Sequence, residues 1–394
     1  MDVLIAGGGP AGSVAALVLA RAGVRVRVVD RASFPRDKLC GDTINPGALA
    51  LLDRLGLGAE VRARGFRTRG MQVTGPGGAV VPGVYEAPFS GAALSRRVFD
   101  QILLSAAAEA GAVIDERRRV AHPLVEQGRV VGLRLTSGGR TEAVRAPLVI
   151  AADGRPSTIA FALGLARFAP APQRWAYGAY YAGVQALSAF GEMHVRRGHY
   201  LGIAPLPDGL ANVCVVRAWR RGVVPPVSGD ILQQTIARDD TVAGRFDRAE
   251  RVGPVMVLGP LAVDAQAAGM PGLLLAGDAA GFIDPITGDG IRFALRGAEL
   301  AAQAALESLA SGLPTHEALA RRRTREFGGK WRFNRALRTL TAMPAAVSVA
   351  AAVSARWGGP VRPLIAMAGD LRYARAEQRI LQDVCAEAGA LGLR

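Results

Sequence analysis

The chain opens with the stretch DVLIAGGGPAGSVAALVLARAGVRVRVVD, residues 2–30, and this stretch decides the fold. An apolar run leads into a glycine-rich turn, then into an Ala/Leu/Val-rich segment and a second apolar run that ends at Asp30. The pattern predicts a strand over 2–6, a helix over 13–21 and a second strand over 24–29. Such a unit is typical of doubly wound α/β folds that bind dinucleotides.

Each glycine of the turn has its own expected task. Gly7 permits the tight turn, Gly9 lets the backbone approach a pyrophosphate, and Gly12 lets the helix pack closely on the strand. The N-terminus of the helix would face the phosphates, and Asp30 would accept hydrogen bonds from ribose hydroxyls. These residues leave FAD and NAD open as the dinucleotide. The cofactor-binding residues expected in this unit are Gly7, Gly9, Pro10, Ala11, Gly12, Asp30 and Arg31.

Two further apolar runs end in glycine and aspartate turns. The first is VIAADGRPST, residues 149–158, and the second is LLLAGDAAG, residues 273–281, which is followed by Pro285 and by TGDGI at 287–291. Asp278 is placed to hydrogen-bond a ribityl chain, and the amides from Gly288 to Ile291, at a helix N-terminus, are placed to stabilise negative charge on a flavin. The residues expected to bind the cofactor here are Asp153, Gly154, Gly277, Asp278, Gly288, Asp289, Gly290 and Ile291.

Together the three segments resemble the aromatic-hydroxylase-like FAD oxidoreductases, the superfamily of the group A flavin monooxygenases. There the N-terminal glycine motif, a central DG motif and a distal GD motif occur in this order, and the resemblance covers nearly the first 300 residues. It implies FAD rather than NAD. It also implies an α/β fold, with a Rossmann-like FAD-binding domain, an inserted antiparallel-sheet substrate domain and a C-terminal helical segment.

Two shorter motifs point to one branch of that superfamily. FPRDKLCGD, residues 34–42, looks like the P-x-x-K-x-C-G signature of geranylgeranyl-reductase-like flavoproteins, and RRVFD, residues 96–100, resembles their R-x-x-F-D helix start. The resemblance implies that Arg96, Cys40 and Gly41 contact the cofactor and that the backbone of Val120 lies beside adenine. Cys40 is a weak candidate for an acid that protonates substrate; the interpretation we favour is a small buried residue that packs the loop.

The segment HYLGIAP, residues 199–205, departs from the reductase pattern Y-x-W-x-F-P. Gly202 and Ala204 occupy the positions of the bulky aromatics, so the substrate side of the flavin is expected to be roomier unless other residues refill the space. This departure weakens the transfer of isoprenoid specificity. The residues expected to line the substrate pocket are His199, Tyr200, Gly202, Ala204 and Pro205.

Composition sets limits on partners and compartment. The formal net charge is +15, but the arginines are scattered rather than gathered in a stripe, which argues against nucleic-acid binding. The three cysteines are too dispersed for disulfides, and neither they nor the four histidines have metal-ligand spacing, so we expect no metal. The first strand begins without a basic leader, and Thr339–Ala355 falls short of the ~20 apolar residues of a bilayer span. A cytoplasmic protein is expected, with a peripheral position at the inner face of the membrane as the alternative.

The motifs divide the chain into three parts. The expected parts are an FAD-binding domain over 1–70, 91–165 and 266–325, a substrate-binding domain over 71–90 and 166–265, and a C-terminal helical cap over 326–394. Arginines among apolar residues of the tail leave contact with a membrane or a carrier protein as an alternative, but a cap over the substrate pocket is the favoured interpretation.

The first functional hypothesis is a flavin-dependent monooxygenase that hydroxylates a hydrophobic aromatic or polyketide-like molecule, with NAD(P)H as a transient reductant and Pro285 shaping the pocket. The alternative is a reductase of isoprenoid double bonds, with Cys40 as the weak candidate for the acid. A halogenase is less favoured because the paired-tryptophan signature W-x-W-x-I-P is absent. A flavin-binding module without activity would leave the large substrate domain unexplained.

Overall fold

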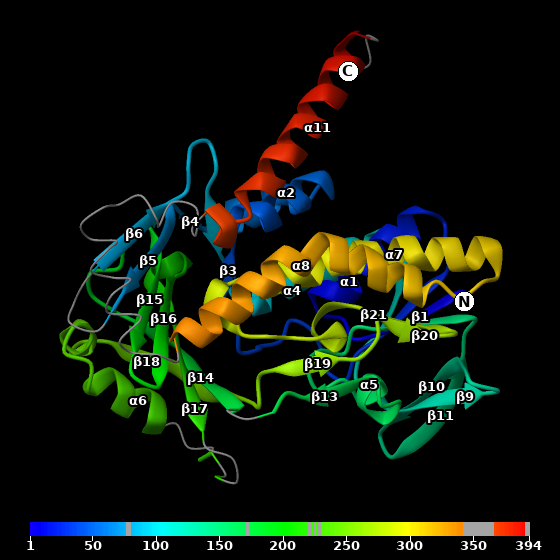
Figure 1. The fold of residues 1–394 in the computed structure, drawn as a ribbon, viewed down its shortest axis with the longest axis horizontal. Helices are drawn as coiled ribbons and strands as arrows, with labels where there is room; N and C mark the ends of the chain where they lie inside the picture. Colours follow the sequence, from blue (N-terminus) through cyan, green and yellow to red (C-terminus); the bar gives the residue numbers. More distant parts are fainter. Residues whose placement is uncertain are drawn as a thin grey trace.

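The computed structural model describes residues 1–75, 80–170, 173–219, 223, 225–226, 230–341 and 366–390. Two large sheets dominate them, one mostly parallel and one mostly antiparallel, and long helices cover the parallel sheet (Figure 1). The expected α/β class, with a Rossmann-like sheet, antiparallel sheets and C-terminal helices, is confirmed. The expected domain boundaries stay a prediction.

The six-stranded sheet has the order β20-β21-β12-β1-β2-β8, and only β20 runs antiparallel to its neighbour. Its central strands are short runs of Val, Leu, Ile and Ala that are buried along their whole length, because layers cover both faces of the sheet. The strands span Val3–Ala6 (β1), Val26–Val29 (β2), Val113–Asp115 (β8), Leu148–Ala151 (β12), Gly269–Met270 (β20) and Leu273–Leu275 (β21).

Helices cover one face of this sheet and a small sheet covers the other. The helical layer consists of α1 (Pro10–Arg21), α4 (Arg96–Glu109) and α7 (Gly290–Ser311). The opposite layer consists of β9 (Arg119–Glu126), β10 (Arg129–Ser137), β11 (Arg140–Arg145) and α5 (Thr158–Ala162). Helix α1 begins at Pro10, earlier than the expected residue 13, because proline suits the first helical position and Gly9 supplies an extended N-cap.

The seven-stranded sheet has the order β18-β14-β17-β16-β15-β5-β6 and is antiparallel except where β15 pairs with β5. Its side chains alternate between two cores, so one face packs on α6 (Asp230–Ala237) and the other faces the six-stranded sheet region. The strands span Gly70–Thr74 (β5), Val80–Val84 (β6), Gln173–Ala182 (β14), Phe190–Arg196 (β15), His199–Pro205 (β16), Leu210–Trp219 (β17) and Glu250–Leu258 (β18).

Short elements connect the two sheets. A three-stranded sheet is formed by β3 (Thr43–Ile44), β7 (Gly91–Ala93) and β4 (Phe66–Thr68), beside α2 (Pro46–Arg54) and α3 (Gly58–Arg64). A two-stranded one is formed by β13 (Ala166–Phe168) and β19 (Val263–Ala265). The 3-10 helices are η1 (Pro207–Gly209), η2 (Ala243–Phe246), η3 (Gly277–Ala280) and η4 (Pro285–Thr287).

Of the two described C-terminal helices, one packs on the helical layer and the other on α2. Helix α8 (His316–Thr341) begins ahead of the expected boundary at residue 326 and lies along α7, whereas α11 (Leu371–Ala390) starts beside α2 and projects from the body (Figure 1). Arg54 of α2 forms ion pairs with Glu299 of α7 and Glu377 of α11. None of the described helices has the length and apolar character that a bilayer span requires. Most of Thr339–Ala355 lies outside the described residues.

Candidate functional site

A cavity of about 810 Å³ lies where the two large sheets meet. This volume lies within the range of about 300–1,000 Å³ that is usual for small-molecule and cofactor sites. Segments far apart in the sequence line it, and they include most of the expected cofactor residues. Those that line the cavity are Gly7, Gly9, Pro10, Ala11, Asp30, Arg31, Cys40, Gly41, Arg96, Val120, Asp153, Gly154, Gly277, Asp278, Gly288, Gly290 and Ile291.

The N-terminal glycine turn forms one end of the cavity, and two of its glycines, Gly7 and Gly12, leave no room for a Cβ atom. Gly7 has a φ of +101°, and a Cβ on it would lie 2.3 Å from the carbonyl oxygen of Ala152. A Cβ on Gly12 would lie 1.7 Å from the Gly7 oxygen, so Gly12 permits close packing but does not line the cavity. Asp30 braces the turn, because its carboxylate accepts hydrogen bonds from Gly8 N–H at 2.7 Å and Ala32 N–H at 2.8 Å.

Cationic side chains gather next to this turn. Arg36 and Arg96 both bind the buried carboxylate of Asp100, with N···O distances of 3.0 and 2.6 Å. Lys38 forms no ion pair among the described residues, and burial lowers its pKa to about 8. Arg36 lines the cavity and has one buried nitrogen, Nη1, without a hydrogen-bond partner in the described structure. Cations with unmet donors beside a glycine turn fit a pyrophosphate.

The sequence pointed to the signature segment FPRDKLCGD but did not single out Arg36 or Lys38 as site residues. Both lie inside this segment, so their positions within the motif were a usable signal. Asp153 itself accepts a hydrogen bond from Thr158 N–H at 2.8 Å, while its other oxygen is buried with no partner among the residues described.

The first turn of α7 forms the far end of the cofactor region. Gly288, Gly290 and Ile291 line the cavity. The side chain of Asp289 does not, because its Oδ1 accepts hydrogen bonds from Lys330 of α8 at 2.5 Å and from Asn45, the N-cap of α2, at 3.0 Å. Any contribution of Asp289 to the cofactor site is therefore made by its backbone, together with the partial positive charge of the helix N-terminus.

Residues 1–243 match the model of the FAD binding domain family. The chain belongs to the geranylgeranyl-reductase-like FAD oxidoreductases. It is 31% identical to a digeranylgeranylglycerophospholipid reductase of Methanoculleus marisnigri, over 81% of this chain and 79% of that protein. It is 33% identical to a menaquinone reductase of Mycobacterium tuberculosis, over 77% and 76% of the two chains.

Solved structures share the fold of this FAD oxidoreductase. A flavin-dependent brominase superposes with a TM-score of 0.82 at 20% identity, covering 98% of this chain and 99% of that one. A geranylgeranyl bacteriochlorophyll reductase-like protein of Thermoplasma acidophilum superposes with a TM-score of 0.78 at 23% identity, covering 97% and 98%. At these identities the likeness establishes the fold, and FAD follows from the family match.

The remaining part of the cavity is a mostly apolar chamber under the seven-stranded sheet. Gly202 and Ala204 line it, as expected, and a Cβ on Gly202 would meet only backbone oxygens at 3.8 and 3.9 Å. The space opposite Gly202 is therefore not refilled at this position. The other lining residues of the chamber include Met71, Ala176, Met193, Leu258, Leu261, Phe282 and Pro285.

Three residues expected in the substrate pocket do not line the cavity. His199 and Pro205 follow the opposite parity of β16 from Gly202 and Ala204, so they belong to the other face of the sheet. Tyr200 has the right parity but is buried deeper, with its hydroxyl donating to Asp284 at 2.7 Å. The expectation that these three contact the substrate stays a prediction, and along the strand successive side chains point to opposite faces of the sheet.

Cys40 and Cys214 both line the chamber and both are free thiols. Burial raises the pKa of Cys40, although the Arg96 guanidinium and the Asp42 backbone N–H act in the opposite direction. The thiol is therefore protonated at neutral pH and is poorly suited to act as a nucleophile. Its position beside the chamber leaves it able to donate a proton.

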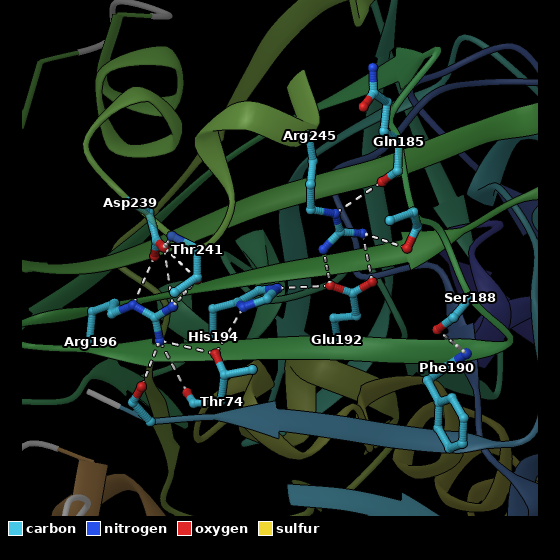
Figure 2. A network of polar contacts seen from close by, with 12 residues as sticks. Thr74, Gln185, Ser188, Phe190, Glu192, His194, Arg196, Asp239, Thr241 and Arg245 are labelled. Carbon is cyan, nitrogen blue, oxygen red and sulfur yellow. Dashed lines mark hydrogen bonds and ion pairs between the residues drawn. The ribbon is translucent and has the colours of Figure 1, made fainter. Parts of the chain in front are cut away.

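The opposite face of the seven-stranded sheet carries a separate buried polar network (Figure 2). Glu192 of β15 binds both Arg245 of η2, at 2.6 and 2.9 Å, and His194, at 2.9 Å. The other His194 nitrogen contacts the Thr74 hydroxyl at 2.9 Å. Arg196 continues the row with an ion pair to Asp239 at 2.8 Å. This network fastens the segment around α6 and η2 to the sheet.

Proposed function

We propose that this protein is an FAD-dependent reductase of isoprenoid double bonds. The observation that carries the proposal is the similarity, at 31–33% identity over about three quarters or more of both chains, to reductases named for digeranylgeranylglycerophospholipid and menaquinone. Both of these molecules carry isoprenoid chains. The first hypothesis from sequence, a monooxygenase, receives less support than its alternative.

The chamber suits an apolar, flexible substrate. Its walls are Ala, Leu, Met and Phe side chains, and burying a prenyl chain against them is favourable at about 25 cal/mol per Å² of apolar surface. FAD supplies a hydride to one carbon of the double bond when it is bound and reduced. The protein orients the chain, excludes water, stabilises negative charge with the α7 amides and holds a thiol proton at Cys40.

A nicotinamide cofactor is proposed as the transient reductant. The chain lacks a second complete glycine fingerprint for a resident NAD(P)H. Contact with a membrane or a carrier protein remains part of the proposal, since isoprenoid lipids are delivered from such environments.

The open space opposite Gly202 favours a second function, hydroxylation of a bulky aromatic or polyketide-like molecule. The two functions differ in whether oxygen is consumed. The test mixes the reduced holoprotein with menaquinone in detergent micelles, once without oxygen and once with it, and weighs the product. A gain of two hydrogens without oxygen supports the reductase. Substrate-stimulated oxygen uptake with a gain of one oxygen atom would overturn it in favour of the hydroxylase.

A further inference from the structure

Asp42 is a fully buried carboxylate directly behind the wall of the cavity. Its chain neighbours Gly41 and Thr43 both line the cavity, and Asp42 itself does not. Its φ is +54°, in the left-handed region that few residue types other than Gly, Asn and Asp adopt. In this conformation the residues before and after Asp42 face the cavity, and the Asp42 carboxylate points to the seven-stranded sheet.

Two donors from neighbouring strands hold one oxygen of this carboxylate. Asp42 Oδ2 accepts hydrogen bonds from the Tyr180 hydroxyl at 2.9 Å and from the Asn212 amide at 2.7 Å. The Asn212 amide also donates to the Cys40 carbonyl oxygen at 2.9 Å, which ties Asp42 to the cysteine loop. Asp42 Oδ1 is buried and has no hydrogen-bond partner among the described residues. A buried oxygen left in this way is costly, because it has lost its hydrogen bonds to water without replacement from the described residues.

The charges around Asp42 leave its carboxyl balanced between two protonation states. Burial raises its pKa to about 7, against the two donors and the more distant Arg96 of α4, while Asp100 of the same helix adds to the rise. No cation forms an ion pair with Asp42 in the described part of the chain. The nearby thiols remain weaker acids, because burial raises the pKa of Cys40 above its ordinary value and that of Cys214 to about 12.

We propose that Asp42 stores a proton for double-bond reduction and returns it to the Cys40 thiol after each turnover. The inference rests on the proposed function. In the reductive step the π bond breaks, one carbon receives a hydride from reduced flavin and its neighbour receives the Cys40 proton. The Cys40 thiolate then takes the proton of the Asp42 carboxyl, and Asp42 regains one from water. Asp42 thus acts through Cys40: it supplies the proton that restores the thiol and does not itself contact the substrate.

The direction of this transfer is favourable. A carboxyl that titrates near neutral pH is a stronger acid than a buried thiol, so the proton moves downhill from Asp42 to a Cys40 thiolate. Tyr180 and Asn212 stabilise the carboxylate that remains. At the same time a pKa near 7 lets the carboxylate regain its proton from water under ordinary conditions.

The test compares first and later turnovers in the holoprotein. Wild type, Asp42→Asn and Tyr180→Phe are reduced anaerobically with excess dithionite and mixed with menaquinone in detergent micelles, and product is counted per flavin. Wild type should turn over repeatedly, at a rate that falls as pH rises through about 7. Asp42→Asn should complete the first turnover, using the proton already on Cys40, and then slow roughly tenfold or more.

Tyr180→Phe supplies a second readout that a purely structural role would not move. Removing the hydroxyl donor destabilises the carboxylate, so the midpoint of the pH–rate profile should move to higher pH while the plateau at low pH is kept. Difference infrared spectra of the substrate-free holoprotein should show a carboxyl that titrates near pH 7 in wild type and is missing in Asp42→Asn.

The outcomes separate this inference from the function on which it rests. If wild type reduces no double bond, the proposed function fails and the inference fails with it. If wild type reduces menaquinone and Asp42→Asn matches it through repeated turnovers at every pH, only the inference is overturned. An unshifted pH profile in Tyr180→Phe would also overturn it.

Discussion

The seven-stranded sheet carries a buried polar cluster on each face, and the two clusters are built differently. On the α6 face, Glu192 has two partners, His194 and Arg245, and Arg196 is paired with Asp239 (Figure 2). On the cavity face, Asp42 has two neutral donors on one oxygen and none on the other. The paired cluster holds elements together. In the incompletely paired cluster, the Asp42 carboxyl can gain or lose a proton near neutral pH.

The largest effect is expected from removing the charge of Asp42. The pKa of Asp42 is about 7 in the folded protein, above the ordinary value of 3.8. The contribution of Asp42 to the free energy of unfolding is therefore fully present below pH 3.8 and is lost as pH rises through 7. A difference of this size corresponds to at most about 4 kcal/mol. Asp42→Asn should therefore gain stability relative to wild type between pH 4 and pH 8.

Denaturant unfolding of both proteins at a series of pH values measures this gain. The amide that Asp42→Asn introduces brings a buried N–H group without a partner, but the cost of that group does not depend on pH. The pH dependence of the stability difference between the two proteins therefore reports the ionisation of Asp42. If the stability difference between wild type and Asp42→Asn stayed constant across the pH range, Asp42 would not titrate there. Both polar clusters of the sheet would then hold fixed charges.

The second largest effect tests the paired cluster. Arg245→Met leaves the Glu192 carboxylate buried with His194 alone, and breaking a buried pair in this way costs about 3 kcal/mol or more. The midpoint of denaturant unfolding should fall while FAD affinity is kept, because Arg245 lies on the far side of the sheet. Arg145→Met is the matched control: its pair with Glu126 is exposed to solvent, so its loss should leave the unfolding midpoint nearly unchanged. Equal losses in both variants would contradict the distinction.

The third effect concerns Lys38, a buried cation that lines the cavity. Lys38 has a pKa lowered to about 8 by burial, against the attraction of the Asp278 carboxylate, and forms no ion pair in the described structure, so FAD phosphates are its expected counter-charge. Lys38→Met should weaken FAD binding roughly tenfold, the value of about one charge-assisted hydrogen bond. In wild type the affinity should decline as pH rises above about 8, and the variant should lose that decline. Fluorescence titration of the apoprotein with FAD measures both.

The sequence could predict the cofactor end of the site far better than the substrate end. The turn from Gly7 to Gly12 and the Gly277-Asp278 turn are contiguous motifs, so their spacing alone carries the geometry. The Asp42 cluster joins residues that lie 138 and 170 positions from it, at Tyr180 and Asn212. No local pattern records such a contact, because strand pairing between distant segments creates it.

At the substrate end, the face of the sheet on which each strand residue lies could be predicted from sequence. The period of two along β16 separates Gly202 and Ala204 from His199 and Pro205, and the alternation is visible once a strand is assumed. The deep position of Tyr200 was not, because it depends on Asp284, a residue 84 positions away. Likewise, the turn of Asp289 away from the cavity depends on Lys330 of α8.

The smallest effect compares two glycines on the cavity face of the same sheet. A Cβ on Gly202 would meet nothing nearer than 3.8 Å, whereas a Cβ on Gly178 would lie 2.4 Å from the Leu39 side chain. Gly202→Ala should stabilise the protein by about 0.5 kcal/mol, because it restricts the unfolded chain without a clash. Gly178→Ala should destabilise it by about 1–3 kcal/mol through overpacking. Thermal unfolding of the two holoproteins measures the pair. A loss of stability in Gly202→Ala would mean that the chamber is already filled at that position, and the cavity face would then be as closely packed as the α6 face.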